Sequence, residues 1–365
     1  MKRRNFLLAA AAAPTLAQVP QWAIAQQLPF NPKPANWRTF ELVTRVEIAK
    51  PAGETKIWVP LPSVDSDYQK TVTDSWTGNT SNARIVSDGK YGAMMLLAEF
   101  SPNERMPWVE VTSRFQTRDR SLDFARRSGE TLSPQERAFY TEATSLMPVD
   151  GIVRKTALEA TKGAKTEMEK ARALYEWIVD NTFRDPKTVG CGRGDVKVML
   201  ETRNLSGKCA DLNALYVAMA RSVGLPARDV YGIRVAKSQF GYRSLGAGTE
   251  NVTRAQHCRA EVFVNGSGWI PVDPADVRKV VLEEKPQVVT LADPVVPPVR
   301  SKLFGAWEMN WLGYNFAHDI ALPGSRKAKI PFLMYPQGET SAGRLDSLDP
   351  DAFRYRITSR EITAA

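Results

Sequence analysis

The chain has 365 residues, of which 43% are hydrophobic and 24% charged, and its formal net charge is +9. This length favours two domains, and the sequence shows no internal repeats or low-complexity tracts. The charge is modestly basic, with no Lys/Arg run and no nucleic-acid-binding motif, so we expect no nucleic-acid partner.

Residues 1–25 have the features of a twin-arginine signal peptide. The motif RRNFL at positions 3–7 matches the twin-arginine pattern, and AIA at 23–25 is a small-x-small cleavage site. The Ala-rich core between them is too short and too weakly apolar for a membrane span. We therefore expect a mature chain from Gln26 that is periplasmic or secreted, with no stable membrane insertion after cleavage. A plain Sec signal is the alternative.

Residues 26–117 are predicted to form a β-sandwich domain. Four strand-length runs, TFELVTRVEI, TKIWVPLP, AMMLLAEF and WVEVTSRFQT, are separated by clusters of Gly, Asn, Asp and Pro. Residues 118–165 are predicted to be a helical connector, in which Ser133 and Glu136 form a capping box. Thr166 and Glu169 repeat this pattern at the start of the next helix, whose buried face we expect to carry Ala171, Leu174, Tyr175, Ile178 and Val179.

A lone cysteine, Cys209, is predicted to lie in the first turn of the following helix. The stretch GKCADLNALYVAMARSVGLPAR (207–228) has apolar residues at helical spacing from Leu212 to Val223, and Gly224 then ends the helix. A thiol at a helix N-terminus faces unpaired backbone N–H groups and the positive end of the helix dipole, which both favour the thiolate. Cys209 is therefore a candidate nucleophile.

A β-hairpin is predicted to supply the base for this nucleophile. His257 begins an alternating strand, NGSG at 265–268 forms the turn, and the return strand ends at Asp273. The hairpin brings a histidine and an aspartate onto neighbouring strands, which is the base and orienter part of a Cys-His-Asp triad. The sequence does not fix the register of the hairpin, so Asp276 competes with Asp273 for the role of orienter.

Two further cysteines and a second histidine need an explanation. Cys191 and Cys258 are expected to be buried free thiols, with a disulfide between them as the alternative. A metal site is disfavoured because no CxxC or HxxxH spacing is present, and we expect neither a metal nor another cofactor. His318, beside Asp319, has no cysteine near it in sequence and is expected to be structural.

Aromatic residues gather in the C-terminal part of the chain. Read as a strand, Trp307, Met309 and Trp311 share one face, which is expected to pack on the outer layer of the sheet. An aromatic wall beside the substrate cleft is the alternative. The tail at 346–365 is predicted to contain one last strand.

The cysteine, histidine and aspartate motifs together resemble those of transglutaminase-like proteins. The motifs are GKCADLNALYVAMARSVGLPAR, HCRAEVFVNGSGW and PVDP, in the order and spacing of that family, and the resemblance covers roughly residues 166–276. It implies a papain-like fold with Cys209 as nucleophile, His257 as general base and Asp273 as orienter. The sequence departs from the family in having Cys258 where an aromatic residue is common, and in lacking an obvious side-chain donor for the oxyanion ahead of Cys209.

The expected fold is therefore α+β. An N-terminal β-sandwich is joined to a transglutaminase-like core at 166–345, in which a buried helix carrying the cysteine packs on an antiparallel sheet. The expected function is acyl transfer, most simply hydrolysis of a peptide or amide bond in the cell envelope, with a peptide, protein or peptidoglycan peptide as substrate. A cross-linking transamidase and a non-catalytic envelope scaffold that retains the triad are the alternatives.

Overall fold

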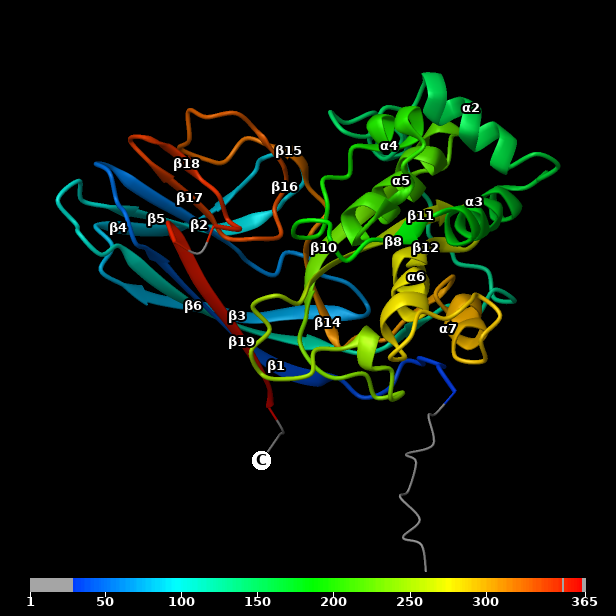
Figure 1. Cartoon of the computed structure of the whole chain (residues 1–365), viewed down its shortest axis with the longest axis horizontal. Coiled ribbons are helices and arrows are strands. Elements are labelled where there is room, and N and C mark those ends of the chain that lie inside the picture. Colours follow the sequence, from blue (N-terminus) through cyan, green and yellow to red (C-terminus); the bar gives the residue numbers. More distant parts are fainter. Residues whose placement is uncertain (1–28, 350, 363–365) are drawn as a thin grey trace, which may run out of the picture.

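The computed structural model describes residues 29–349 and 351–362. The signal peptide predicted at 1–25 lies outside this range. In the described residues the fold is α+β, with a β-sandwich beside a core in which helices cover an antiparallel sheet (Figure 1). None of the helices described is both long and apolar enough to cross a membrane.

Two antiparallel sheets form the sandwich, and their facing sides bury one apolar core. The first sheet has the order β19-β1-β6-β3 and the second the order β18-β17-β2-β5-β4. The strands of the first sheet are β1 (Arg38–Ile48), β3 (Gln69–Gly78), β6 (Trp108–Thr117) and β19 (Phe353–Ile362). Those of the second are β2 (Thr55–Pro60), β4 (Asn82–Ser87), β5 (Met94–Phe100), β17 (Gln337–Thr340) and β18 (Gly343–Leu345).

The sandwich is built from both ends of the chain, which differs from the predicted boundaries. Residues 337–345, expected in the catalytic core, pair through β17 with β2. The predicted tail strand is β19, and it pairs with β1 along ten residues, from Thr39 opposite Ile362 to Ile48 opposite Phe353. Such pairing between distant segments leaves little local signal, because each strand alone shows only its own alternation.

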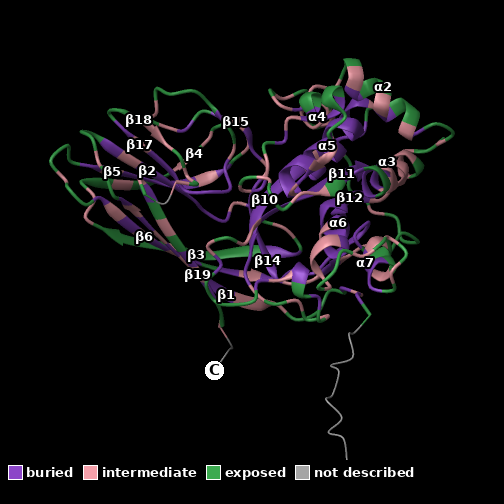
Figure 2. Cartoon of the chain, viewed as in Figure 1, coloured by how far each residue is buried: buried purple, intermediate pink, exposed green. Residues whose placement is uncertain are grey.

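The helix that begins with Cys209 is α5 (Cys209–Ser222), and it is buried on every side (Figure 2). It packs on the sheet β12-β11-β10-β14 and is surrounded by α2, α3, α4 and α6. The helices of this region are α1 (Pro134–Phe139), α2 (Gly151–Ala160), α3 (Glu167–Asn181), α4 (Val196–Thr202), α6 (Pro274–Glu283), α7 (Val296–Lys302) and a short 3₁₀ turn, η1 (Arg243–Leu245). Since α2 packs on α5, part of the predicted connector belongs to the core.

The core sheet contains the predicted hairpin. Its strands are β10 (Ala227–Arg234), β11 (Gln256–Val264), β12 (Gly268–Val272) and β14 (Trp311–Asn315). Ala260 lies opposite Val272 and Phe263 opposite Trp269, so the hairpin prediction is confirmed. The remaining strands form three two-stranded sheets. These pair β7 (Arg120–Ser121) with β13 (Ala306–Trp307), β8 (Phe183–Arg184) with β9 (Ser206–Gly207), and β15 (His318–Ile320) with β16 (Ile330–Phe332).

The local signals at two helix starts are also confirmed. The Ser133–Glu136 capping box begins α1 and the Thr166–Glu169 box begins α3. Both boxes satisfy backbone N–H groups that a helix cannot pair internally. The residues buried by α3 are the five that the 3.6-residue period predicts, Ala171, Leu174, Tyr175, Ile178 and Val179.

Candidate active site

Cys209 is the first residue of α5, as predicted, and it is 3% exposed. Asp211, two residues further on, fixes this helix entrance. Its carboxylate accepts hydrogen bonds from the backbone N–H groups of Lys208 (3.0 Å), Arg193 (3.0 Å) and Gly194 (2.9 Å). The backbone of the preceding loop is thereby tied to the turn that carries the thiol.

The loop that carries Gly192 approaches α5 so closely that this position requires glycine. Gly192 has a φ of +94°, and a Cβ on it would lie 1.8 Å from Oδ2 of Asp211. No other residue fits this space or adopts this φ without strain. The neighbouring Cys191 carbonyl accepts a hydrogen bond from the Ala210 N–H (2.9 Å), so Cys191 is held against the first turn of α5.

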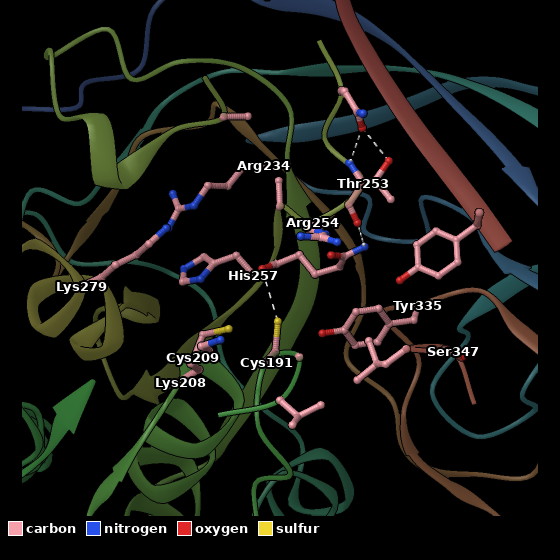
Figure 3. A pocket seen from close by; sticks show the side chains of 18 of the residues that line it. Cys191, Lys208, Cys209, Arg234, Thr253, Arg254, His257, Lys279, Tyr335 and Ser347 are labelled. Carbon is pink, nitrogen blue, oxygen red and sulfur yellow. Dashed lines mark hydrogen bonds between the residues drawn. The ribbon is translucent and has the colours of Figure 1, made fainter. Parts of the chain in front are cut away.

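His257 and Asp273 meet through their side chains. Nε2 of His257 lies 2.8 Å from Oδ2 of Asp273, and both residues are buried. Because Nε2 faces Asp273, Nδ1 is the ring nitrogen that does not take part in this contact. Figure 3 shows the His257 ring beside the Cys209 side chain. The structure thus brings together the three residues that the sequence analysis selected.

The two candidate orienters have different partners. Oδ2 of Asp276 is 3.5 Å from Nε2 of His257, and its Oδ1 is 2.5 Å from a guanidinium nitrogen of Arg234. Asp273 instead caps α6, with its Oδ1 accepting from the Asp276 N–H at 3.1 Å. The distances favour Asp273 as the residue that orients the imidazole, with Asp276 held mainly by Arg234.

The backbone of His257 is held by a tryptophan. Nε1 of Trp311 donates to the His257 carbonyl at 2.8 Å. The indole ring crosses β10 at Gly232, where a Cβ would lie 2.4 Å from the ring and 2.0 Å from the Leu312 carbonyl. Gly232 is therefore the residue that allows Trp311 to reach His257.

All three cysteines are free and buried, and the thiols of Cys191 and Cys258 both lie within hydrogen-bonding reach of Cys209. Hydrogen bonding from the Cys191 thiol, then from the Cys258 thiol and from His257, holds the pKa of Cys209 well below its ordinary value despite burial. The same bond to Cys209, together with burial, raises the pKa of Cys191. Burial first, and then Cys209, raises the pKa of Cys258. Cys209 is therefore the thiol that ionises.

The charges around His257 favour its protonated form. Burial lowers the pKa of His257, but the carboxylates of Asp276 and Asp273 outweigh it, and the pKa lies above the ordinary value. A thiolate at Cys209 beside an imidazolium at His257 is the ion pair that an acyl-transfer enzyme needs before substrate arrives.

The site opens into a cavity of about 740 Å³ that is lined by both Cys209 and His257. Its aromatic lining comes from the C-terminal segments, as Phe353, Tyr335 and Tyr355. The aromatic wall considered for Trp307 and Trp311 is wrong, because both indoles are fully buried and neither lines the cavity. They pack in the core, so a packing role is confirmed for this segment. The expected single strand is wrong, because Trp307 ends β13, Trp311 begins β14, and Met309 lies between these two strands.

The carboxylates at the site are poorly suited to a metal ion. His257, Asp273 and Asp276 offer ligand atoms within 4.8 Å of one another. However, Arg234 already contacts Asp276, and Nε of Arg259 lies 3.5 Å from Oδ2 of Asp273. Two guanidinium groups supply the positive charge that a cation would otherwise bring.

His318 is not part of this arrangement. It is 4% exposed, its Nδ1 lies 3.2 Å from the Tyr231 hydroxyl, and it does not line the cavity. Asp319, its neighbour in sequence, instead accepts a hydrogen bond from the Ser145 N–H at 2.8 Å.

Sequence reasoning missed three residues that build the site, namely Asp211, Arg234 and Trp311. Only Asp211 had a local signal, since an acid three residues after the N-cap is the second half of a capping box. Arg234 and Trp311 reach the site from β10 and β14, and their roles depend on strand pairing that the sequence does not display.

Comparisons with known proteins identify the family and the fold. A family model described as the transglutaminase-like superfamily matches residues 154–274, which include Cys209, His257 and Asp273. An uncharacterized protein of Haemophilus influenzae is 36% identical over 326 residues, covering 85% of this chain and 87% of that protein. The uncharacterized protein YebA of Bacillus subtilis is 21% identical over 241 residues, which are 65% of this chain and 31% of that protein.

Among solved structures, a candidate cysteine protease from Cytophaga hutchinsonii has a similar fold. The TM-score is 0.50 at 14% sequence identity, and the match covers 90% of this chain and 99% of that one. At this identity the likeness concerns the fold alone. The chain belongs to the transglutaminase-like superfamily.

Proposed function

We propose that the protein is an exported cysteine hydrolase that cleaves a peptide or amide bond in the cell envelope. The observation that carries this proposal is that Cys209 and His257 line one cavity, with Asp273 hydrogen-bonded to the imidazole at 2.8 Å. Membership of the superfamily supports a cysteine-type enzyme.

The proposed reaction has two steps. The Cys209 thiolate attacks the amide carbonyl carbon, and the imidazolium of His257 gives its proton to the leaving amine as the C–N bond breaks. Water then loses a proton to His257 and attacks the thioester, and cleavage of the C–S bond releases the carboxylic acid and regenerates the Cys209 thiolate beside the His257 imidazolium. Asp273 stabilises the imidazolium and holds the ring in one tautomer. The backbone N–H of Cys209 is the proposed donor to the oxyanion, because a helix cannot pair its first N–H groups internally and those of Lys208 and Ala210 already donate to Asp211 and to the Cys191 carbonyl.

The experiment is a cleavage screen with the purified protein and its Cys209→Ala variant. Envelope proteins and peptidoglycan peptides are incubated with each, and new termini are identified by mass spectrometry. Products that appear with the wild type and not with Cys209→Ala support the hydrolase. Cys209-dependent incorporation of a fluorescent primary amine, without cleavage, would instead favour the cross-linking transamidase. Neither product, with Cys209 unreactive toward electrophiles, would favour a non-catalytic scaffold.

We also propose export by the twin-arginine route, with a mature chain that begins at Gln26. The support is the RRNFL motif and the AIA cleavage site in the sequence. Replacing Arg3 and Arg4 together by Lys should abolish export, as judged by periplasmic fractionation. Continued export of that variant would point to the Sec route.

A further inference from the structure

Apart from the Cys209–His257 pair, the charged side chains that line the active-site cavity are all basic. They come from five different segments of the chain and are Arg184, Lys208, Arg234, Arg254 and Lys279. Among the described residues that line the cavity there is no aspartate or glutamate. In Figure 3 the four of them that are labelled, all except Arg184, lie around Cys209 and His257.

Three of these cations share two carboxylates that do not line the cavity. Arg234 contacts Asp276 at 2.5 Å, and Arg184 contacts Glu283, which also lies 3.7 Å from Nζ of Lys279. The five basic residues that line the cavity are called the basic wall below. These contacts neutralise the basic wall only in part, because three of its cations face two carboxylates.

The other two cations have no acidic partner. In the part of the chain that the structure describes, neither Lys208 nor Arg254 has a carboxylate oxygen within ion-pair distance. Lys208 immediately precedes Cys209, and Arg254 is exposed three residues before His257. Both ends of the catalytic pair are therefore flanked by an uncompensated positive charge.

The state of Lys279 is consistent with excess positive charge in the cavity. Burial and then the nearby Arg234 lower the pKa of Lys279 to about 8. An ammonium group that is desolvated and repelled by a neighbouring cation gains from an anion brought into the same space.

We propose that the cavity selects acidic peptides, in which a carboxylate lies beside the scissile amide and is bound by this basic wall, with Arg254 as a specificity-determining residue. The inference rests on the proposed function, because the nucleophile defines where the amide lies. The excess positive charge attracts the anion, and a guanidinium with no partner can bind a carboxylate through two parallel hydrogen bonds.

The first test does not need the natural substrate. Cys209 is alkylated with iodoacetate, which is anionic, and with iodoacetamide, which is neutral and of similar size. The measured quantity is the ratio of the two rate constants at Cys209, read by mass spectrometry. His257 also attracts anions when protonated, so the wild-type ratio alone is not decisive, and the comparison of variants carries the test.

Arg254→Gln should lower the iodoacetate rate about fivefold and change the iodoacetamide rate less than about twofold. Arg254→Lys should retain most of the iodoacetate rate because it keeps the charge. Arg254→Gln combined with Lys279→Gln should lower the ratio further, and salt should weaken the wild-type preference. Arg326→Gln is the matched control, since Arg326 is exposed on the loop between β15 and β16 and does not line the cavity. A ratio that is equal in wild type, Arg254→Gln and the double variant would overturn the proposal.

The second test uses peptides that the cleavage screen identifies, each made with Glu and with Gln beside the scissile bond. The Glu peptide should be preferred about tenfold in kcat/KM, mainly through KM, and Arg254→Gln should remove the preference. Equal cleavage of both peptides would overturn the acidic preference and leave the hydrolase standing. If no peptide is cleaved but the alkylation ratio depends on Arg254, the hydrolase proposal fails and the anion selectivity of the cavity stands.

Discussion

Two buried histidine–aspartate pairs in this fold have opposite electrostatic surroundings. In the first, His257 contacts Asp273 at 2.8 Å and lines a cavity of about 740 Å³ with Cys209. In the second, Nε2 of His318 lies 3.7 Å from Oδ2 of Asp229, beside a space of about 10 Å³. Such a space holds about one water molecule, so no substrate can reach the second pair.

The protonation states of the two histidines differ because the charges around them differ. Near His257 the carboxylates outweigh burial and raise the pKa. Burial, together with the positive charges of Arg221 and Lys90, holds the pKa of His318 well below its ordinary value. A histidine next to an aspartate is therefore not a sufficient signature of a catalytic base, because the surrounding charges and access to a cavity decide its role.

The largest expected difference is between His257→Gln and His318→Gln. Loss of the proposed base should reduce amide hydrolysis by about a thousandfold or more, and should slow alkylation of Cys209 at pH 7. His318→Gln should leave turnover within about threefold, because it touches no reacting atom, and should lower thermal stability instead. Turnover assays and thermal melts on both variants check this. Loss of turnover in a stably folded His318→Gln would break the comparison.

The next effect separates the two carboxylates near His257. Asp273→Ala should lower kcat by about a hundredfold or more, because the imidazole loses the group that fixes its tautomer. Asp276→Ala should act mainly on stability, because it leaves the buried Arg234 guanidinium without its partner. Kinetics and thermal melts are measured on both. If Asp276→Ala abolishes turnover and Asp273→Ala does not, the orienter has been assigned to the wrong residue.

Local sequence patterns predicted well the helices and the hairpin that surround the His257–Asp273 pair. The capping box of α3, the α5 start at Cys209 and the hairpin carrying His257 follow from residues close together in sequence, and all three are present. The turn chemistry and the 3.6-residue and 2-residue periods determine such elements because only neighbouring residues take part.

Long-range pairing could not be predicted in this way. The contribution of β17, β18 and β19 to the sandwich depends on contacts with β1 and β2, roughly 300 residues earlier. The helical spacing of apolar residues in α5 indicates one buried face, but the structure buries all of its faces because other helices cover the side away from the sheet. The basic wall of the cavity likewise comes from five separate segments, and no single segment shows it.

The third prediction concerns the thiols beside the first pair. Cys209 should react with iodoacetamide at pH 7 at least about tenfold faster than Cys191 or Cys258, because its pKa is lowered and theirs are raised. Its reactivity should persist below pH 7, where an ordinary thiol is almost wholly protonated. Cys191→Ala should move the labelling profile of Cys209 to higher pH by removing a hydrogen-bond donor. Equal labelling of all three in the folded protein would remove the basis for choosing Cys209.

The smallest expected effect concerns the second pair and the pH dependence of stability. Burial raises the pKa of Asp229 to about 7, and neither of its carboxylate oxygens has a hydrogen-bond partner among the described residues. The unfolded chain loses this proton near pH 4. Between about pH 4 and pH 7 the folded state therefore binds more protons, and this group's contribution to the free energy of unfolding falls as pH rises.

Asp229→Asn removes that titration. The melting temperature of the variant relative to wild type should consequently be higher at pH 8 than at pH 5, by about 2 to 5 °C. His318 has the opposite sign: its lowered pKa removes stability as pH falls below about 6.5, because the unfolded state then binds the extra proton. Melts of Asp229→Asn in a His318→Gln background isolate the aspartate. A difference between variant and wild type that is the same at both pH values would show that Asp229 is ionised in the folded protein as readily as in the unfolded chain.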